Sequence, residues 1–274
     1  MAKKQHEFFE YVGAILKKKI ANLMISSDTL LFEIRNTLSR AANPETQASS
    51  QRFYKQGEPP LLFGVKNAEV TSIAKKILKS IKTLPKENIW KLCDSLWKSG
   101  YCEEAIVACT FSESLRKQYT GDDFYIFEFW VKNFEKNGSH CDTFCIHTVG
   151  TFLMMHPDYL SQMKKWAEKN HRWTKSAAAV SLIIPARKGL FLKEVIQIAD
   201  ILLEDADDMV QKGYGWLLKT ACQTHLQSIY EYILSKKELM PRTAFRYAIE
   251  KNASRNESRS HEKINEKGKY FFWM

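Results

Sequence analysis

A tryptophan between two lysines makes the segment QKGYGWLLK a candidate site for chemistry. Lys212, Trp216 and Lys219 follow the i, i+4, i+7 pattern and therefore share one face of a predicted helix. Lysines attract phosphates and an indole ring packs on sugar or base, so this face is a candidate nucleic-acid surface. The alternative is a core tryptophan beside two solvated lysines. Gly213 and Gly215 flank the stripe and would permit close approach of another backbone.

Three more basic residues fall in neighbouring predicted helices. Arg242 and Arg246 are four residues apart and share a helix face, and Lys175 lies in an earlier helix. We expect each such residue to contribute a modest, sequence-independent contact with a DNA phosphate. The predicted DNA-binding residues are Trp216, Lys212, Lys219, Lys175, Arg242 and Arg246.

Cys141 and Cys145 stand four residues apart, with His140 and His147 close by. Two thiolates at this spacing can share a zinc ion, but the histidines do not lie cleanly on the same helix face. No distant CxxC or HxxxH motif supplies further ligands. We therefore predict no metal site and no cofactor, and two small thiols that are buried or face a groove. The sequence also contains no GxxxxGK[ST], GxSxG or paired-carboxylate motif.

From about residue 86 the chain alternates two kinds of predicted helix at a nearly constant period. First helices are expected at 86–98, 122–137, 157–169, 190–203 and 223–235. Each is followed by a partner, at 101–118, 140–155, 173–187, 206–221 and 240–252. The partners recur about every 33 to 39 residues, a period typical of helix-pair repeats.

Residues at the breaks between these segments favour helix ends there. Asp205 and Asp207 can accept hydrogen bonds from the free amides of a helix start. Pro157 and Pro241 occupy positions where first-turn prolines are tolerated. Pro185 is expected to kink or stop its helix.

A helix pair of this size cannot bury its apolar face alone, and the stacking of successive pairs solves this problem. We therefore predict an all-α fold, a HEAT-like helical-repeat solenoid (α-α superhelix) that is curved and has a basic concave face. Large apolar residues at helical spacing are expected to fill its core. Examples are Trp90, Trp97, Phe127, Phe134, Leu160 and Ile196.

A single repeat domain is predicted for residues 1–251, followed by a charged tail at 252–274 that is expected to be flexible. Residues 86–251 hold the regular helix pairs. Residues 1–85 are less regular, with helices expected at 4–20, 27–41 and 66–82. The tail ends in YFFWM, which would either dock on the body or bind something else.

The overall charge indicates the kind of partner. A net charge of +10 and a pI of about 9.2 attract polyanions, nucleic acid before anionic membranes. The alternative is a soluble protein that merely carries many lysines. The sequence shows no signal peptide and no membrane-spanning run, and its cysteines form no CxxC pair. These features predict a cytoplasmic monomer, nucleoid-associated in a bacterium, with reduced thiols.

Three segments, in order, resemble one protein family. QKGYGWLLK is similar to the signature QKAIGWxLR of the AlkD-like DNA alkylation repair proteins. HCDTFCIHTVGTFLMMHPDYL, which begins at His140, looks like that family's WWDxVDxIxPTFLGxxxxxHPEL. Phe63-Gly-Val is similar to its FxGIxxPEL segment. The resemblance covers roughly residues 40–250 and keeps the order and spacing of the motifs.

This resemblance implies a HEAT-like DNA glycosylase that excises N3- and N7-alkylated purines from double-stranded DNA. Such bases carry a positive charge and are good leaving groups. The family's chemistry therefore needs mainly a carboxylate near the sugar, to stabilise developing positive charge and to position water. It is also expected to proceed without full extrusion of the base from the duplex.

The positions that carry this chemistry in the family hold other residues here. The family's Trp-x-x-x-Asp reads Cys141 and Cys145, and the arginine of its Trp-x-x-Arg reads Ser176. Only Trp216 matches by residue type. A free thiol is mostly protonated at pH 7 and gives no fixed negative charge. Asp142 is the fallback carboxylate, and its position predicts an N-cap or first-turn role.

The sequence therefore predicts a DNA-binding protein of the alkylation repair class that lacks, or has altered, the standard catalytic mechanism. It would be an unusual glycosylase or a catalytically degenerate relative that recognises alkylated or distorted duplex DNA. The alternative is a protein–protein scaffold with no DNA role, because the same fold is common among scaffolds. A basic concave face and salt-dependent DNA binding would favour the first hypothesis.

Overall fold

The computed structural model describes residues 27–51, 61–133 and 138–250. The regular secondary structure in these ranges is helical, and the single β-type pairing found there is an isolated bridge between Leu61 and Tyr101. The predicted all-α fold is confirmed.

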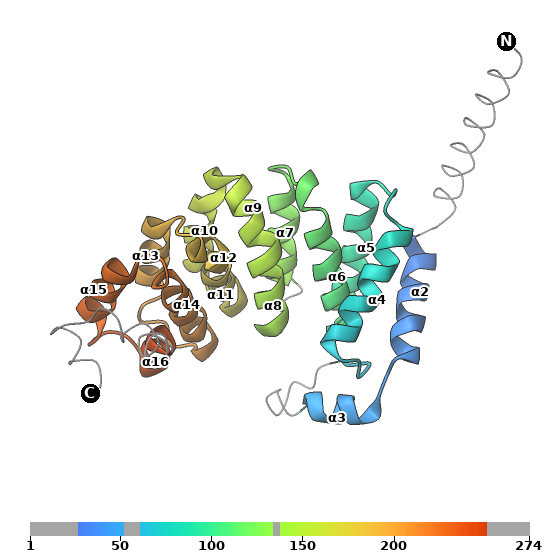
Figure 1. Cartoon of the computed structure of the whole chain (residues 1–274), viewed down its shortest axis with the longest axis horizontal. Helices are drawn as coiled ribbons and strands as arrows, with labels where there is room; N and C mark the ends of the chain where they lie inside the picture. Colours follow the sequence, from blue (N-terminus) through green and yellow to red (C-terminus); the bar gives the residue numbers. More distant parts are fainter. Residues whose placement is uncertain (1–26, 52–60, 134–137, 251–274) are drawn as a thin grey trace, which may run out of the picture. The chain divides into compact units, whose positions relative to one another are not determined.

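The chain divides into two compact units, residues 1–144 (unit 1) and 145–274 (unit 2). Each unit has its own helices, which Figure 1 labels. The expected helix at 4–20, the core position Phe134 and the tail at 252–274 lie outside the described residues. That residues 1–251 form one domain stays a prediction.

Unit 1 begins, within its described part, with α2 and ends with α8 (Figure 1). Its helices are α2 (Ser27–Arg40), α3 (Pro44–Gln51), α4 (Asn67–Ser80), α5 (Lys86–Ser99), α6 (Cys102–Ser114), the 3-10 helix η1 (Arg116–Gln118), α7 (Asp123–Asn133) and α8 (Gly138–Phe144). Helix α3 was not predicted from the sequence, although its start signals are present. Pro44 occupies the first position, and the Asn43 side chain accepts a hydrogen bond from Thr46 N at 3.0 Å.

Aromatic side chains form the core of unit 1. Trp90, Trp97 and Phe127 are buried, as the helical spacing predicts. The rings of Trp90 and Trp130 meet edge to face, with centroids 5.7 Å apart. Trp90 also donates from Nε1 to a carboxylate oxygen of the buried Asp123 at 3.0 Å, so the polar edge of this buried ring is satisfied.

Unit 2 contains the more regular repeats (Figure 1). Its elements are the π-helical turn η2 (Cys145–Val149), α9 (Gly150–Met155), the 3-10 turn η3 (Pro157–Tyr159), α10 (Leu160–Ala167), α11 (Arg172–Val180), α12 (Ile183–Arg187), α13 (Leu192–Ile201), α14 (Asp208–Ala221), α15 (Leu226–Lys236) and α16 (Arg242–Ile249). The predicted pairs are present, with two of the expected helices interrupted.

Both interruptions have a local cause in the sequence. The expected helix at 173–187 divides into α11 and α12 because Pro185 has no N–H to donate to the Ser181 carbonyl. That carbonyl lies against α9, where a Cβ added at Gly150 would be 2.7 Å from its oxygen. The expected helix at 140–155 contains the π-helical turn directly before Gly150. A π turn inside a helix realigns the faces on its two sides.

The second helices of unit 2 pack side by side, with α14 between α11 and α16 (Figure 1). Glycines permit this close packing, as the sequence predicts. A Cβ at Gly213 would lie 3.1 Å from Ser176 Oγ on α11. A Cβ at Gly215 would lie 2.7 Å from the Ala244 carbonyl oxygen on α16. We call these three helices the inner layer of unit 2.

Two predicted core positions of unit 2 are only half-buried. Leu160 and Ile196 keep part of their surface, whereas Met163, Val195 and Ile198 are fully buried in their place. The spacing of apolar residues located the buried side of each helix but not the residues at the centre of that side. Both half-buried residues lie on the first helix of their pair, where one side faces solvent.

Candidate nucleic-acid interface

The stripe on α14 that the sequence singles out is the accessible side of that helix. Lys212, Trp216 and Lys219 are each partly exposed, while their neighbours at 213–215 and 217–218 are buried. Trp216 is half-buried, so its ring packs on the protein with one part and faces outward with the other. The shared face is confirmed, and binding of DNA by it stays a prediction.

At the amino-terminal end of this stripe, every basic side chain of the inner layer is paired with an aspartate. Lys175 contacts Asp205 at 2.6 Å, Arg172 contacts Asp207 at 2.6 Å and Lys212 contacts Asp208 at 3.0 Å. A phosphate would have to displace a carboxylate to bind any of these three cations. This end of the layer is therefore locally neutral. We call these six residues the paired cluster.

Helix capping explains why the carboxylates lie there. Asp207 is the N-cap of α14, and its Oδ1 accepts a hydrogen bond from Met209 N at 2.9 Å. Asp205 Oδ1 accepts from Asp207 N at 2.9 Å. Both capping roles are predicted from the sequence. The other oxygen of each carboxylate remains available and binds a cation of α11, Arg172 or Lys175.

The carboxy-terminal part of α14 and its neighbour α16 have a different charge balance. Arg242 and Arg246 are exposed on α16, one turn apart. Lys219 Nζ and Arg246 Cζ each lie 5.7 Å from the ring centroid of Tyr247. The carboxylate that α16 contributes here is Glu250, 3.7 Å from Lys219 and more than half exposed. We call Lys219, Arg242, Arg246 and Tyr247 the open cluster.

The positions that the family uses for catalysis lie in the interior. Cys141 and Cys145 have no exposed surface, and Ser176 is 3% exposed. Ser176 Oγ packs against Gly213 in the contact between α11 and α14. In this structure none of the three side chains can reach a ligand at the surface. They act as small packing residues, as predicted for the two thiols.

Asp142, the fallback carboxylate, is half-buried. Burial raises the pKa of its carboxyl group to about 6, because removal of water disfavours the charged form. The predicted capping role is wrong. Since α8 begins at Gly138, Asp142 lies in the second turn of the helix, where the backbone amides already have partners within the helix.

The cysteine and histidine residues around α8 do not assemble a metal site in the described part of the chain, where no group of three or more His, Cys, Asp and Glu side chains could hold an ion. All six cysteines lie in the described residues, where they are buried and form no disulfide bond. Burial lowers the pKa of His140 to about 4, whereas His147 is exposed. No helix among the described residues is long and apolar enough to cross a membrane.

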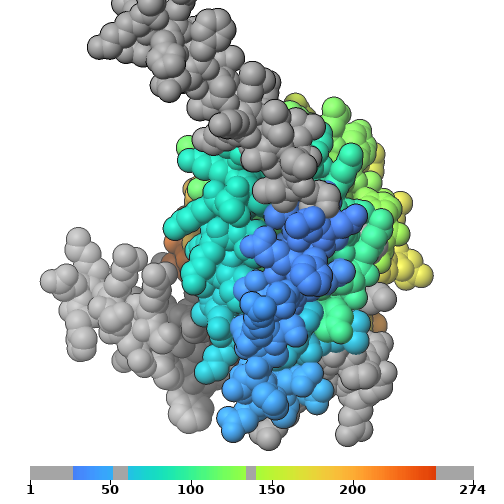
Figure 2. Space-filling view, turned by 90° about the vertical axis from the view of Figure 1, so that its right-hand side faces the viewer, coloured from blue at the N-terminus to red at the C-terminus, as the bar shows by residue number. Residues whose placement is uncertain are grey.

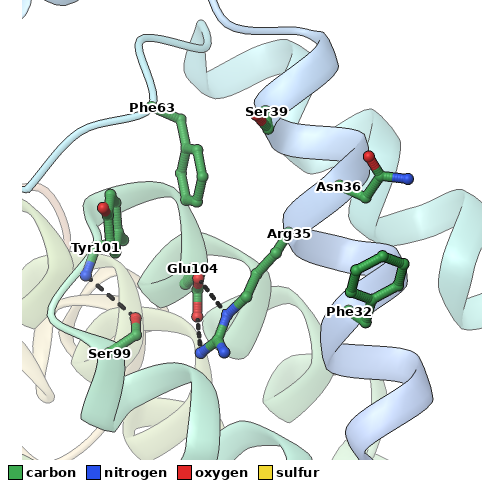
Figure 3. A pocket seen from close by; sticks show the side chains of 8 residues that line it. All are labelled: Phe32, Arg35, Asn36, Ser39, Phe63, Ser99, Tyr101 and Glu104. Atoms are coloured by element: carbon green, nitrogen blue, oxygen red, sulfur yellow. Dashed lines mark hydrogen bonds and ion pairs between the residues drawn. The ribbon is translucent and has the colours of Figure 1, made fainter.

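Unit 1 contains a cavity of about 590 Å³ beside α2, the helix seen in dark blue in Figure 2. The close-up in Figure 3 shows Arg35 reaching from α2 toward Glu104 of α6. Arg35 donates from Nε and Nη2 to the two carboxylate oxygens at 2.9 and 3.0 Å. This bidentate pair neutralises the one cation of the cavity. The cavity therefore has no net charge for a polyanion, and the rings of Phe63 and Tyr101 make its wall apolar.

A second buried carboxylate explains the Phe63-Gly-Val segment. Glu103 accepts hydrogen bonds from the backbone amides of Phe63, Gly64 and Val65 at 3.1, 2.8 and 3.1 Å. Gly64 has φ +89°, and a Cβ there would be 2.7 Å from the Asn43 carbonyl oxygen, so only glycine fits. This motif of the sequence is structural, because it fastens the segment before α4 to the start of α6.

Sequence reasoning missed three members of the two clusters. The i, i+4 spacing of Asp208 and Lys212 was a signal that these two residues could form an ion pair. The pairing of Arg172 with Asp207 depends on the packing of α11 against the start of α14. Tyr247 gave no such signal, because its contact with Lys219 depends on the packing of α16 on α14. The sequence found the cations and the caps, but not which of them pair.

Comparisons with known proteins agree with this arrangement of helices. The profile of a protein family described as DNA alkylation repair enzyme matches residues 34–251. A solved structure described as a predicted DNA alkylation repair enzyme from Enterococcus faecalis superposes with a TM-score of 0.68 and 18% identity. The match covers 77% of this chain and 97% of that one, and shows a shared fold. A search of curated proteins gives no match.

Proposed function

Because the chain belongs to the DNA alkylation repair enzyme family, we propose that it binds the backbone of double-stranded DNA with the inner layer of unit 2. In this proposal α11, α14 and α16 form the concave face of a helical-repeat solenoid, and α14 and α16 supply its positive charge outside the paired cluster. The protein acts as a monomer without a cofactor, and its target is alkylated or distorted duplex DNA.

One observation carries the proposal: the accessible side of α14 is a lysine–tryptophan–lysine stripe next to two exposed arginines of α16. Lys219, Arg242 and Arg246 supply positive charge, which phosphates bind irrespective of base sequence. The exposed part of the Trp216 ring supplies an apolar surface for a deoxyribose or a base. Charge together with an aromatic ring suits a sugar–phosphate chain better than it suits an acidic protein surface.

The proposal does not include base excision by the family's usual mechanism. That mechanism needs a carboxylate close to the sugar of the damaged nucleotide. Cys145, which occupies the resembling position, is fully buried and has no carboxylate to offer. Asp142 is half-buried and its pKa is raised, so it is a poor substitute for a fixed negative charge. We propose that the protein recognises damaged DNA and excises bases slowly or not at all.

A binding titration of a short DNA duplex against salt concentration tests the proposed surface. We expect the logarithm of the binding constant to fall linearly with the logarithm of the salt concentration. Replacement of Lys212, Lys219 and Arg246 together by alanine should lower the affinity at least ~10-fold and make the salt dependence shallower. Unchanged binding by this triple variant would remove the assignment.

A matched control removes three positive charges from helices outside the inner layer, on the first helix of two pairs. Lys193, Lys236 and Lys237 lie on α13 or at the end of α15 and are replaced together by alanine. Their loss should change DNA affinity less than ~2-fold if the inner layer is the binding surface. Equal losses in both triple variants would show that only the total charge matters.

Release of 7-methylguanine from methylated DNA tests the catalytic part of the proposal. We expect weak or no release by the wild-type protein. A robust rate that is abolished in Asp142→Asn would show that Asp142 is the catalytic carboxylate, and the proposal of a recognition protein would then fail. The same DNA serves both assays, so binding and excision are measured side by side.

A further inference from the structure

Tyr247 lies under two cations that come from different helices. Lys219 Nζ on α14 and Arg246 Cζ on α16 are each 5.7 Å from the centroid of its ring. The negative face of an aromatic ring attracts a cation, and one ring thus orients both side chains. Two like charges near one ring also repel each other, and this repulsion decreases when an anion binds both.

The position of Tyr247 is set by the closest backbone contact of the inner layer. A Cβ at Gly215 would lie 2.7 Å from the Tyr247 Cβ and 2.7 Å from the Ala244 carbonyl oxygen. Ala244 is fully buried in this contact. Because Gly215 has no side chain, α16 can pack closely against α14. This close packing brings the tyrosine ring next to Lys219. The two cations are positioned by rigid helices and not by loops.

Among the described residues, no close carboxylate balances the charge around Tyr247. The carboxylate of Glu250 is 3.7 Å from Lys219 and is more than half exposed, so solvent screens this pair. Arg242 and Arg246 take part in no ion pair within the described residues. In the paired cluster, by contrast, each cation has an aspartate at 3.0 Å or less.

A similar pair elsewhere in unit 2 shows what a complete arrangement looks like. Lys236 lies 5.8 Å from the ring centroid of Tyr232 and 2.9 Å from Asp200, which also accepts a hydrogen bond from the Tyr232 hydroxyl at 3.1 Å. One ring, one cation and one carboxylate are present there. Around Tyr247 there are two cations, and in the described part of the chain no carboxylate contacts either of them as closely as 2.9 Å. The missing component is an anion.

We propose that Lys219 and Arg246, held by the ring of Tyr247, form a binding site for one backbone phosphodiester of duplex DNA. The inference rests on the proposed function and adds Tyr247, as a positioning residue, and a defined phosphate position. Trp216 lies on the accessible side of α14, one turn before Lys219, and packs on the sugar next to that phosphate. An ester phosphate with its sugar uses both features, whereas free inorganic phosphate uses the cations alone.

The experiment compares Tyr247→Leu with Tyr247→Phe in the duplex titration against salt. The ring and not the hydroxyl holds the cations, so Phe should keep the wild-type affinity within ~2-fold. Leu should weaken binding ~3–10-fold and reduce the magnitude of the salt slope by about 1, as expected for one lost phosphate contact. Wild-type binding by Tyr247→Leu, or equal losses in both variants, would overturn the inference.

Two surface variants keep the test valid if Tyr247→Leu is poorly folded. Lys219→Ala and Arg246→Ala should each reduce affinity and slope, and their combination should lose less than the product of the single effects, because they hold the same phosphate. Lys236→Ala is the matched control, a lysine over a tyrosine ring, and should bind like the wild type. Unchanged slopes in both Lys219→Ala and Arg246→Ala would contradict the site. Thermal unfolding of each variant checks the fold.

The outcomes separate this inference from the proposed function. If wild-type protein shows no salt-dependent binding to the duplex, both fail. If it binds and the variants at Lys219, Arg246 and Tyr247 behave like the wild type, only the phosphodiester site fails. Inorganic phosphate, added at constant ionic strength, should compete weakly. Displacement of DNA by phosphate at low millimolar concentrations would assign the site to the free anion and overturn the inference.

Discussion

The two ends of the inner layer of unit 2 contain similar numbers of basic side chains, but these side chains form close ion pairs at one end only. In the paired cluster, Lys175, Arg172 and Lys212 each contact an aspartate within 3.0 Å. In the open cluster, Lys219 and Arg246 share a tyrosine ring, and the carboxylate that pairs with Lys219 is exposed and 3.7 Å away. A count of lysines and arginines along the sequence cannot distinguish these two situations. The free charge for a polyanion lies near α16.

The cavity of unit 1 supports the same lesson. Arg35 lines the cavity and is half-exposed (Figure 3), as an arginine that binds an anionic ligand would be. Its bidentate contact with the buried Glu104 uses that charge inside the protein. Position in a cavity is therefore a weaker indicator of anion binding here than the absence of a close carboxylate.

The largest expected difference between the two ends concerns the glycines that pack them. Gly215→Ala should lower the free energy of unfolding by roughly 2–3 kcal/mol, because its Cβ would be 2.7 Å from the backbone of α16. Gly213→Ala should change stability by less than about 1 kcal/mol, since a serine hydroxyl at 3.1 Å can rotate away and alanine favours helix. Chemical denaturation followed by circular dichroism measures both. Equal losses would mean that the two helix contacts are equally tight.

Asp142 extends the comparison to a half-buried carboxylate whose pKa is raised by burial. Its folded-state pKa of about 6 exceeds the ordinary 3.8, so the folded state binds a proton more tightly than the unfolded state. Stability due to this group is therefore highest below pH 4 and falls as the pH rises toward 6. Asp142→Asn should stabilise the protein by about 1–2 kcal/mol at pH 7.5 and hardly at pH 4.

Denaturation at the two pH values measures this effect. Asp207→Asn is the control, because Asp207 has Arg172 as a cationic partner and caps α14. It should not raise stability at pH 7.5. If Asp142→Asn stabilised the protein equally at both pH values, burial of the charged carboxylate would not be the cause of the effect.

Single charge removals compare the ends directly in DNA binding. Arg242→Ala, in the open cluster, should weaken binding to a duplex ~3–10-fold. Lys175→Ala, in the paired cluster, should weaken it less than ~2-fold, because Asp205 already neutralises that lysine. Fluorescence anisotropy at fixed ionic strength gives both values. A larger loss for Lys175→Ala would show that DNA displaces the aspartates and that the pairing has no consequence.

The smallest expected effect comes from removing carboxylates. Asp208→Asn should free Lys212 and tighten DNA binding ~2–3-fold. Glu250→Gln should tighten it less, because the 3.7 Å contact with Lys219 is long and exposed. The same anisotropy assay measures both, with the salt slope of Asp208→Asn expected to become steeper. A stronger effect of Glu250→Gln would show that Lys219 is neutralised more than Lys212, and the charge at α16 would then not be the free one.

Much of the fold follows from local patterns. The helix pairs, the caps at Asp205 and Asp207 and the break near Pro185 depend on residues close in sequence, so their energetics can be judged from the chain alone. The π-helical turn directly before Gly150 was not predicted from the sequence. Half-burial of Leu160 and Ile196 depends on which neighbours cover them.

For the candidate site, the residue types came from the sequence and the pairing came from the structure. Helical spacing placed Lys212, Trp216 and Lys219 on one face, since side chains three or four residues apart must lie together. The contact between Lys175 and Asp205 joins residues 30 positions apart. Such contacts depend on how α11, α14 and α16 pack.

By itself the sequence determined the helices, their repetition, the family and the set of basic side chains, because each depends on short-range spacing and composition. Only the tertiary structure decided which charges are free, because an ion pair between helices depends on distances that loops and glycine contacts set. Gly215 shows the connection between the two. Its missing side chain can be read in the sequence, but the ring that it brings beside Lys219 is visible only in the packed helices.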